Sequence, residues 1–205
     1  MAFSRYTAKD VAEMERFTRV TFGNTLSGMR SPFLVGTKGP LGTNLAIFNS
    51  IVHIGANPML LGMIFRPDTV ERHTLQNIHR SKIYTLNIVS QDILGAAHMT
   101  SANYPENVSE FEACGFNEKY RNDFEAPFVE ESPLQMALEF REELIISSNQ
   151  TRLLIGEVLD IYVREEAVSP RGEILHETLE SAVVSGLDAY YSVKKVAEMP
   201  YARPQ

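Results

Sequence analysis

The sequence predicts a mainly β fold with short helices, arranged as an antiparallel barrel with helical decoration. About six segments are rich in the β-branched and aromatic residues that are typical of strands. The helical segments between them are short, and they do not alternate with the strands as βαβ units would. Glycine and proline fall mainly between the expected elements, which supports this segmentation.

We expect a single domain over residues 1–205, because no internal repeat or low-complexity linker divides the chain. With 44% hydrophobic residues, the chain can bury a sizeable core. Within this domain we expect an N-terminal arm at residues 1–25 and a C-terminal tail at residues 186–205. Residues 7–19 carry mixed charges and predict a short helix that caps the domain.

The first strands are expected between residues 32 and 65. A strand over 32–37 is closed by a turn at 38–42, which contains two glycines and a proline. Residues 44–54 predict one long strand, since β-branched and aromatic residues run through them. After a turn at 55–58, the continuous apolar run at 59–65 suits a strand that is buried on both faces.

The first helix of the barrel region is expected at about residues 70–80. Leu75, Ile78 and His79 lie on one side of such a helix, as amphipathic spacing requires. Residues 82–89 return to strand character, because their side chains alternate between two faces. Together these segments predict a helix followed directly by a strand.

Two further short helices are expected before the last strands. The first runs over residues 92–101 with Asp92 as its N-cap. The second runs over residues 109–114, where Ser109 is the expected N-cap and Gly115 stands at the C-terminal cap position. Both are too short to form a layer of their own.

The later part of the chain is expected to be mostly β. Strands over residues 137–147 and 151–163 flank a turn at Asn149. Glu157 falls in phase with the apolar residues of the second strand, where a carboxylate must find a partner. We interpret Glu157 as a structural glutamate, with a position facing a subunit interface as the alternative.

The composition limits the partners and the compartment. A net charge of −7 disfavours non-specific nucleic-acid binding, although a local basic site for a small phosphate stays open. Cys114 is the only cysteine, so no intramolecular disulfide can form. The N-terminus lacks an apolar core of signal-peptide length, and no apolar run approaches the roughly 20 residues of a membrane span. We therefore expect a cytoplasmic protein that has no membrane partner.

Several kinds of catalytic chemistry have no sequence signature here. Phosphate-binding glycine motifs and the Gly-x-Ser-x-Gly nucleophile motif are absent. His73 and His79 are six residues apart and lie on different faces of a helix, so no metal site is predicted. Cys114, at an expected helix C-terminus, is interpreted as a packing residue. An enzyme of this sequence would use the reactivity of a cofactor, and we assign no catalytic residue.

Five segments in a fixed order carry a family resemblance: 43–50 (TNLAIFNS), 73–78 (HTLQNI), 84–89 (YTLNIV), 98–101 (HMTS) and 110–116 (EFEACGF). In this order they resemble the flavin-reductase-like family of FMN-binding split barrels, which includes NAD(P)H:flavin oxidoreductases and flavoredoxins. Shorter similarities continue near the C-terminus and extend the resemblance to about three quarters of the chain: 155–158 and 186–191.

The resemblance departs from the family pattern in two places. Arg72 and His73 stand where the family commonly has Lys-Asp, and the C-terminal tail lacks a strong glycine-glycine turn. These departures affect the expected contacts with phosphate and with a nicotinamide.

The resemblance implies a split β-barrel that binds FMN as its cofactor, with NAD(P)H as the co-substrate. It also implies a homodimer with FMN near the interface, hydride transfer to the flavin, and an oxygenase or another redox protein as the electron acceptor. Two alternatives remain open. One is a non-catalytic electron carrier that holds FMN, and the other is a binding module for haem or another flat ligand.

A ring-binding surface is expected on the strand that follows residue 42. Asn44, Ala46 and Ser50 share one face because side chains alternate along a strand. Small and polar side chains within an apolar run leave room for a flat ring, and Phe48 lies on the same face.

The other end of an FMN molecule needs a cation and hydroxyl donors. Arg66 can offer a planar fork to a phosphate, and Thr74 and Asn77 lie three apart on a short helix. Thr100 and Ser101 can reach ribityl hydroxyls, with local bonding at a helix end as the alternative. With the resemblance included, the expected cofactor-binding residues are Thr43, Asn44, Leu45, Ala46, Phe48, Asn49, Ser50, Arg66, His73, Thr74, Asn77, Thr100 and Ser101.

Overall fold

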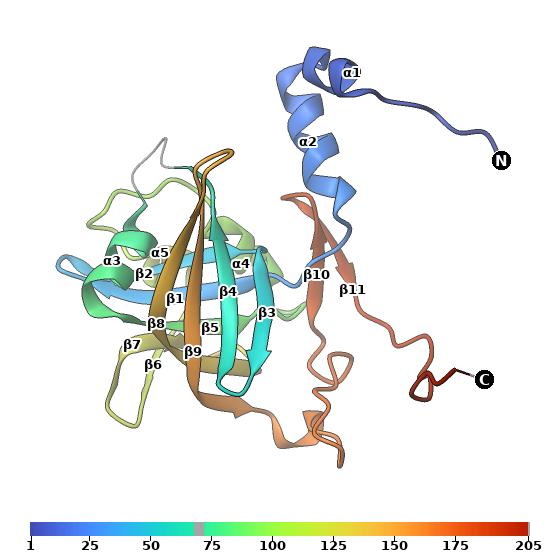
Figure 1. Ribbon diagram of the computed structural model, residues 1–205. Helices are drawn as coiled ribbons and strands as arrows, with labels where there is room; N and C mark the ends of the chain where they lie inside the picture. The colour runs from blue at the N-terminus through green and yellow to red at the C-terminus, as the bar shows by residue number, and fades with distance from the viewer. Residues whose placement is uncertain (68–71, 205) are drawn as a thin grey trace.

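The computed structural model describes residues 1–67 and 72–204, and its centre is one antiparallel sheet of seven strands curved into a barrel (Figure 1). The strand order is β2-β1-β5-β8-β9-β4-β3. Consecutive strands β2 and β3 therefore stand at opposite edges of the sheet, and no ladder between them closes the barrel. The strands are β1 (Phe33–Gly39), β2 (Gly42–Phe48), β3 (Ile51–Ala56), β4 (Met59–Phe65), β5 (Ile83–Ile88), β8 (Leu134–Ile146) and β9 (Thr151–Val163).

Short helices and two small hairpins surround this sheet. The hairpins pair β6 (Glu118–Arg121) with β7 (Phe124–Val129) and β10 (Ala182–Ser185) with β11 (Ala189–Ser192). The helices are α1 (Ala8–Glu13), α2 (Arg16–Leu26), α3 (His73–Ser81), α4 (Leu94–Met99), α5 (Glu110–Cys114) and the 3₁₀ turn η1 (Glu165–Ala167). Within the described residues, no helix has the length and apolar character needed to cross a bilayer.

Two apolar clusters hold the barrel together, one on each face of β1. Val35 packs inside the barrel with Phe65 and Tyr84, whereas Leu34 packs under α4 and α5 with Phe111. Both Leu34 and Val35 are fully buried. Because adjacent side chains of a strand point to opposite faces, β1 must be covered on both sides. The mainly β split-barrel architecture with short helices is thus confirmed.

Most of the expected elements are present, with shifted ends. The strands expected at 59–65 and 151–163 match β4 and β9, and the turn at Asn149 joins β8 to β9 as expected. Gly115 caps α5 in the left-handed conformation, with φ of 77°, as expected. The hairpins β6–β7 and β10–β11 had no counterpart among the expected strands.

The single strand expected at 44–54 is wrong, because the chain leaves the sheet between β2 and β3. Asn49 donates its side-chain amide to the carbonyl of Gly186, and Ser50 donates its hydroxyl to the carbonyl of Ile64. These bonds hold the two residues outside the β1–β2 ladder, so the chain crosses from one edge of the sheet to the other.

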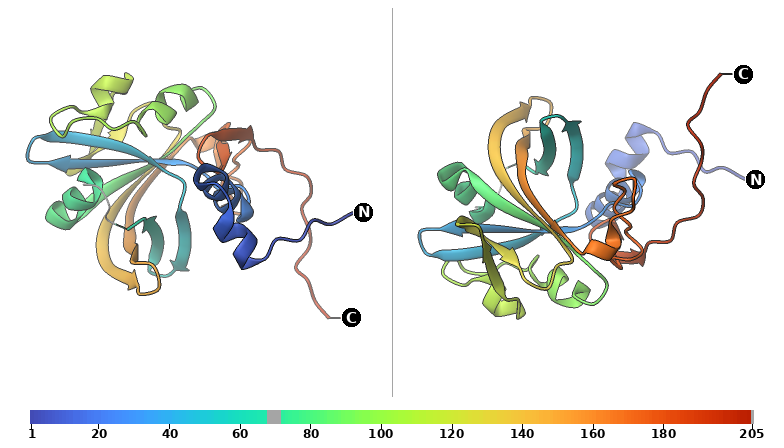
Figure 2. Two further views of the ribbon diagram at one scale, coloured as in Figure 1. Left: turned by 90° about the horizontal axis from the view of Figure 1, so that it is seen from above. Right: turned by 90° about the horizontal axis from the view of Figure 1, so that it is seen from below.

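Two expectations about helix ends and packing are also wrong. Asp92 does not cap α4, whose N-cap is Ile93, because the Asp92 carboxylate accepts a hydrogen bond from Ser90 instead. The arm does not cap its own domain, since α1 and α2 contain no buried residue. Figure 2 shows both helices projecting away from the barrel.

Candidate functional site

A cavity of about 690 Å³ lies where the end of β2 meets β4, the start of α3, and the turn between β10 and β11. This volume lies within the roughly 300–1,000 Å³ that is common for small-molecule sites. Ten of the thirteen expected cofactor-binding residues line the cavity: Asn44, Ala46, Phe48, Asn49, Ser50, Arg66, His73, Thr74, Thr100 and Ser101.

The other three expected residues lie outside the lining of the cavity. The Thr43 hydroxyl contacts Glu118 and Ser109 instead. The Leu45 side chain is fully buried in the cluster under α4 and α5. Asn77 of α3 is buried against β1, and its side-chain amide donates a hydrogen bond to the Thr37 hydroxyl. These three residues therefore contact the elements around the cavity and do not face the cavity itself.

A chain of buried polar groups forms the floor of the cavity. The carboxylate of Glu110, which is 7% exposed, accepts hydrogen bonds from the Asn44 amide at 2.7 Å and from the Leu45 N–H at 2.9 Å. The Thr74 hydroxyl donates to the Asn44 carbonyl at 3.2 Å. These bonds fix β2, α3 and α5 to one another, so the floor is preorganised.

One side of the cavity is cationic. Arg66, at the end of β4, donates to the Asn24 side-chain carbonyl at 3.1 Å, while Arg72 and His73 come from the start of α3. The Nε atom of Arg72 is buried and has no hydrogen-bond partner within 1–67 and 72–204. A buried guanidinium N–H without an acceptor is unfavourable, so this side of the cavity suits an anionic group.

The opposite wall comes from α4 and from the C-terminal hairpin. The Tyr190 hydroxyl lies 2.9 Å from Nδ1 of His98, and the two rings are perpendicular. Burial and the negative charge of Asp188 raise the pKa of Tyr190, so its hydroxyl stays protonated near neutral pH. Asn49 fixes this wall to β2 through its bond to Gly186. The wall therefore presents the hydrogen-bonded pair of His98 and Tyr190 to the cavity.

Apolar side chains flank the middle of the cavity. Phe48 packs on Phe65 with ring centroids 4.9 Å apart, and Ile47 and Ile64 also line the space. A ligand with an anionic end and a flat ring with polar edges is compatible with this arrangement. Among the described residues, no cluster of histidine, cysteine and carboxylate side chains could hold a metal ion.

The hydroxyls of Thr100 and Ser101 form local hydrogen bonds at the end of α4, which was the alternative to contact with a ligand. Thr100 donates to the carbonyl of Ala97, and Ser101 donates to the carbonyl of His98. Both residues line the cavity, and each hydroxyl keeps a lone pair that can accept a hydrogen bond.

Several lining residues are not among the expected contacts, chiefly Arg72, Glu110, His98 and Tyr190. Glu110 lies in the segment 110–116, where no ligand contact was expected, and His98 lies in the segment 98–101, where only Thr100 and Ser101 were expected contacts. Tyr190 lies in the C-terminal segment 186–191, whose resemblance was the available signal. Their position in the cavity depends on contacts between segments far apart in the chain.

Comparison with known families and structures agrees with this geometry. Residues 27–179 match the family model described as "Flavin reductase like domain". A Shewanella frigidimarina protein with a split barrel domain, proposed to be a flavin reductase, is 43% identical. The similarity covers 98% of this chain and 100% of that chain, with a TM-score of 0.93.

More distant structures share the fold. Nitrilotriacetate monooxygenase component B from Bacillus cereus is 21% identical with a TM-score of 0.84, over 97% of this chain and 100% of that chain. Flavoredoxin of Desulfovibrio vulgaris is also 21% identical, with a TM-score of 0.74 over 87% of this chain and 94% of that chain.

Among known sequences, a Deinococcus radiodurans protein described as uncharacterized is 29% identical over 135 residues. The match covers 65% of this chain and 59% of that protein, which is less than two thirds of its length.

Proposed function

Since its residues 27–179 match the family model, this chain belongs to the flavin reductase-like family, and we propose that it is an FMN-binding oxidoreductase that transfers a hydride from NAD(P)H to flavin. Membership supports a flavin cofactor and a flavin-related redox function. The choice of FMN and of NAD(P)H is our proposal. The observation that carries the choice of FMN is the Nε of Arg72 at the cationic side of the cavity, which is buried and has no hydrogen-bond partner among the described residues.

The lining residues fit FMN. Arg72, Arg66 and His73 would hold the phosphate, since a dianion needs fixed cations or N–H donors. Asn44 and Phe48 would contact the ring, with a polar side chain at its edge and an apolar wall beside it. When bound, FMN supplies the ring that accepts the hydride and passes the electrons on.

The role of the protein is then to bind FMN and to orient its ring for hydride transfer. The floor formed by Glu110, Asn44 and Thr74 is already hydrogen-bonded, so little rearrangement accompanies binding. No acid or base is required for hydride transfer, and we assign no catalytic residue. The wall of His98 and Tyr190 would lie beside the ring and limit the space around it.

We further propose that the protein is a cytoplasmic homodimer with FMN near the subunit interface. The reduced flavin would deliver electrons to an oxygenase or to another redox protein. The similarity to a component of nitrilotriacetate monooxygenase supports this kind of partner at the level of fold.

The experiment is an anaerobic titration of the purified protein with FMN, followed by NADH and then by NADPH, read as an absorbance spectrum. We expect flavin bands near ~450 nm that bleach on adding one of the nicotinamides. Bound flavin that stays oxidised with both would instead support an electron carrier, as the likeness to flavoredoxin allows. A protein that binds no flavin would overturn the proposal, and a Soret band would indicate haem.

A further inference from the structure

No surface within residues 28–67 and 72–204 buries a side chain of the arm formed by α1 and α2. Neither helix has a buried residue, and Phe17 and Leu26 of α2 are 74% and 70% exposed. Helices shorter than about 12–15 residues are marginal in water, and α2 has 11 residues, several of them β-branched. The stability of this helix therefore requires a surface that covers it.

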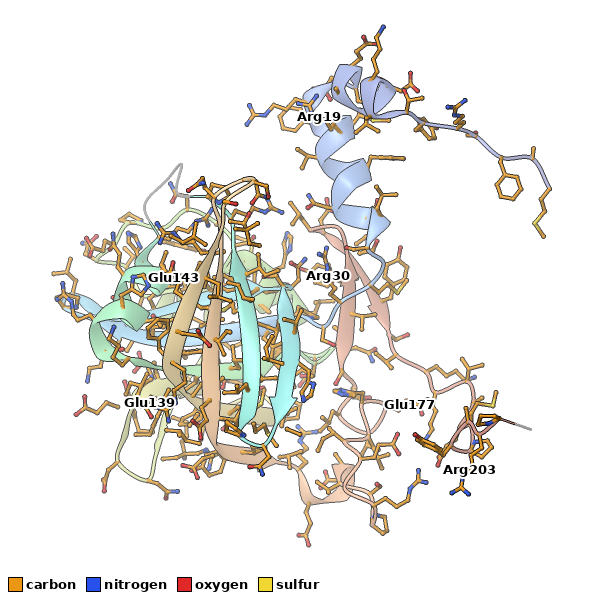
Figure 3. The ribbon with its side chains drawn as sticks, in the orientation of Figure 1. Arg19, Arg30, Glu139, Glu143, Glu177 and Arg203 are labelled. Carbon is orange, nitrogen blue, oxygen red and sulfur yellow. The ribbon has the colours of Figure 1, made fainter. Side chains whose placement is uncertain are left out.

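The arm is anchored at its base. The backbone carbonyl of Asn24 accepts a bond from the Arg30 guanidinium at 3.0 Å, and the Asn24 side chain accepts one from Arg66. The backbone of Arg30 pairs with Val184 of β10. Figure 3 shows Arg30 at this junction, with Arg19 further out on the arm. The arm thus leaves the barrel in a fixed direction.

A second uncovered surface lies on the outer face of the sheet. Val52 of β3, Ile54 of β3 and Leu144 of β8 are 41%, 43% and 49% exposed. They surround Gly62 of β4 and Leu153 of β9. Gly62 lies opposite Val52, and Leu153 lies opposite Leu144 with its side chain reaching over Gly62. Because Gly62 has no side chain, Leu153, Val52 and Ile54 close over it as one continuous surface. We call these five residues the outer patch.

The outer patch continues to the cavity. Ile64 of β4 lies opposite Leu153, which in turn lies opposite Leu144. Ile64 also lines the cavity. A segment seated on the outer patch would therefore close the adjacent edge of the cavity.

One charged residue beside each surface, Arg16 on the arm and Glu142 on the sheet, has the opposite sign to the other. Arg16 lies over the ring of Phe17 on the arm, with its guanidinium carbon 5.9 Å from the ring centroid. Glu142 lies in β8 opposite Ile155, beside the outer patch. Neither Arg16 nor Glu142 forms an ion pair within the part of the chain that the structure describes.

From these observations we infer that α2 of one copy packs its Phe17–Val20 face on the outer patch of a second copy, and that the exchange is reciprocal. Two complementary surfaces that do not meet within one chain can both be covered in a two-fold dimer. Phe17 and Val20 are three apart and share one face of the helix. The inference rests on the homodimer of the proposed function and names the segments that form it.

The test uses the FMN-loaded full chain with single substitutions on each surface, Phe17→Glu on the arm and Ile54→Lys on the outer patch. Light scattering coupled to size exclusion should give a dimer for the wild type. Each variant should raise the dimer dissociation constant about 30-fold or more, as for a buried aromatic or aliphatic anchor. Val196→Glu, at a 95% exposed position of the tail, is the matched control and should leave the dimer intact.

Mixing the two variants separates exchange from other dimers. A heterodimer of F17E and I54K chains has one unaltered arm–patch contact and one contact that pairs opposite charges, so mixing should restore dimers. Variants that dimerise as wild type, or a mixture that stays monomeric, would overturn the inference. Circular dichroism and the melting temperature establish that each variant is folded.

The two proposals fail separately. A wild-type monomer that still bleaches FMN with NAD(P)H overturns the exchange and leaves hydride transfer standing. A dimer that exchanges arms as described, but binds no flavin, overturns the function and leaves the exchange standing. If the arm closes the cavity, the FMN dissociation constant of I54K should rise in parallel with the loss of dimer.

Discussion

Replacing Arg72 by methionine tests the proposed phosphate side of the cavity directly. Methionine keeps an unbranched chain of similar length, so the change removes the guanidinium with little change in packing. Within residues 1–67 and 72–204, the Nε atom of Arg72 is buried and has no hydrogen-bond partner. The structure therefore predicts opposite effects on ligand binding and on stability.

The expected change in FMN affinity follows from the one hydrogen bond that the Nε of Arg72 can donate to a phosphate. A hydrogen bond to a charged group contributes about 1.5–3 kcal/mol, and about 1.4 kcal/mol corresponds to a factor of ten in affinity. Arg72→Met should therefore raise the FMN dissociation constant by roughly 10- to 100-fold. Removal of an unsatisfied buried group should leave the apo melting temperature unchanged or raise it by up to about 6 °C.

The assay is a fluorescence titration with FMN and, in parallel, with riboflavin, which lacks the phosphate. The loss should appear with FMN and be absent with riboflavin, because only FMN can bond the guanidinium. Arg80→Met, on the exposed far end of the same helix, is the control and should change neither affinity. Equal losses for FMN and riboflavin, or an apo protein that melts several degrees lower, would refute the reasoning.

Three further changes test the floor, the barrel interior and the acid limit of stability. Glu110→Ala leaves two buried N–H donors, one of them on Asn44, without an acceptor, and should lower the free energy of unfolding by about 2–4 kcal/mol in a denaturant titration. Gly156→Ala places a methyl group against the buried Tyr84 hydroxyl and should cost about 1–3 kcal/mol, seen as a lower melting temperature. Burial lowers the pKa of His176, so the unfolded chain takes up this proton at a higher pH than the folded protein. The free energy of unfolding should therefore fall as the pH drops from about 7 through the folded-state pKa, and His176→Gln should reduce this fall.

Each of these changes has a matched control in the chain. Glu112→Ala alters an exposed carboxylate on the same helix as Glu110 and should be nearly neutral. Gly95→Ala adds a methyl group with nothing within 4 Å and should not destabilise. His53→Gln, at an exposed histidine, should leave the acid limb of the stability curve unchanged. A control that matches its test variant would contradict the corresponding argument.

The sequence predicts the barrel strands well where one pattern occupies the whole element. The runs at 59–65 and 151–163 coincide with β4 and β9, since turn residues end each of them. The pattern fails at 44–54, where both halves have strand character. The break there depends on bonds from Asn49 to Gly186 and from Ser50 to Ile64, and a local pattern contains no information on partners so distant in the chain.

The residues of the site also fall into those placed by local strand geometry and those placed by the tertiary fold. Alternation along β2 correctly brings Asn44, Ala46 and Phe48 to the cavity, because period-two geometry is a property of the strand alone. The opposite wall of His98 and Tyr190 joins residues 92 positions apart, so its position requires the tertiary fold. The expected arm is helical, but the sequence does not show that these helices project from the barrel and do not pack on it.

The two arginines of the cavity show why residue type alone does not assign a ligand contact. Arg66 is a suitable phosphate ligand by its chemistry, and the structure places it at the cavity, but one of its guanidinium nitrogens is already bonded to Asn24 of the arm. Arg72 differs because its Nε is buried and no acceptor for it lies in the part of the chain that the structure describes. Asn24 also accepts the bond from Arg30, so the base of the arm and the cationic side of the cavity share one residue. A displacement of the arm on forming a dimer would therefore change the position of the Arg66 guanidinium. In this way the contact between subunits would affect the binding of an anion in the cavity.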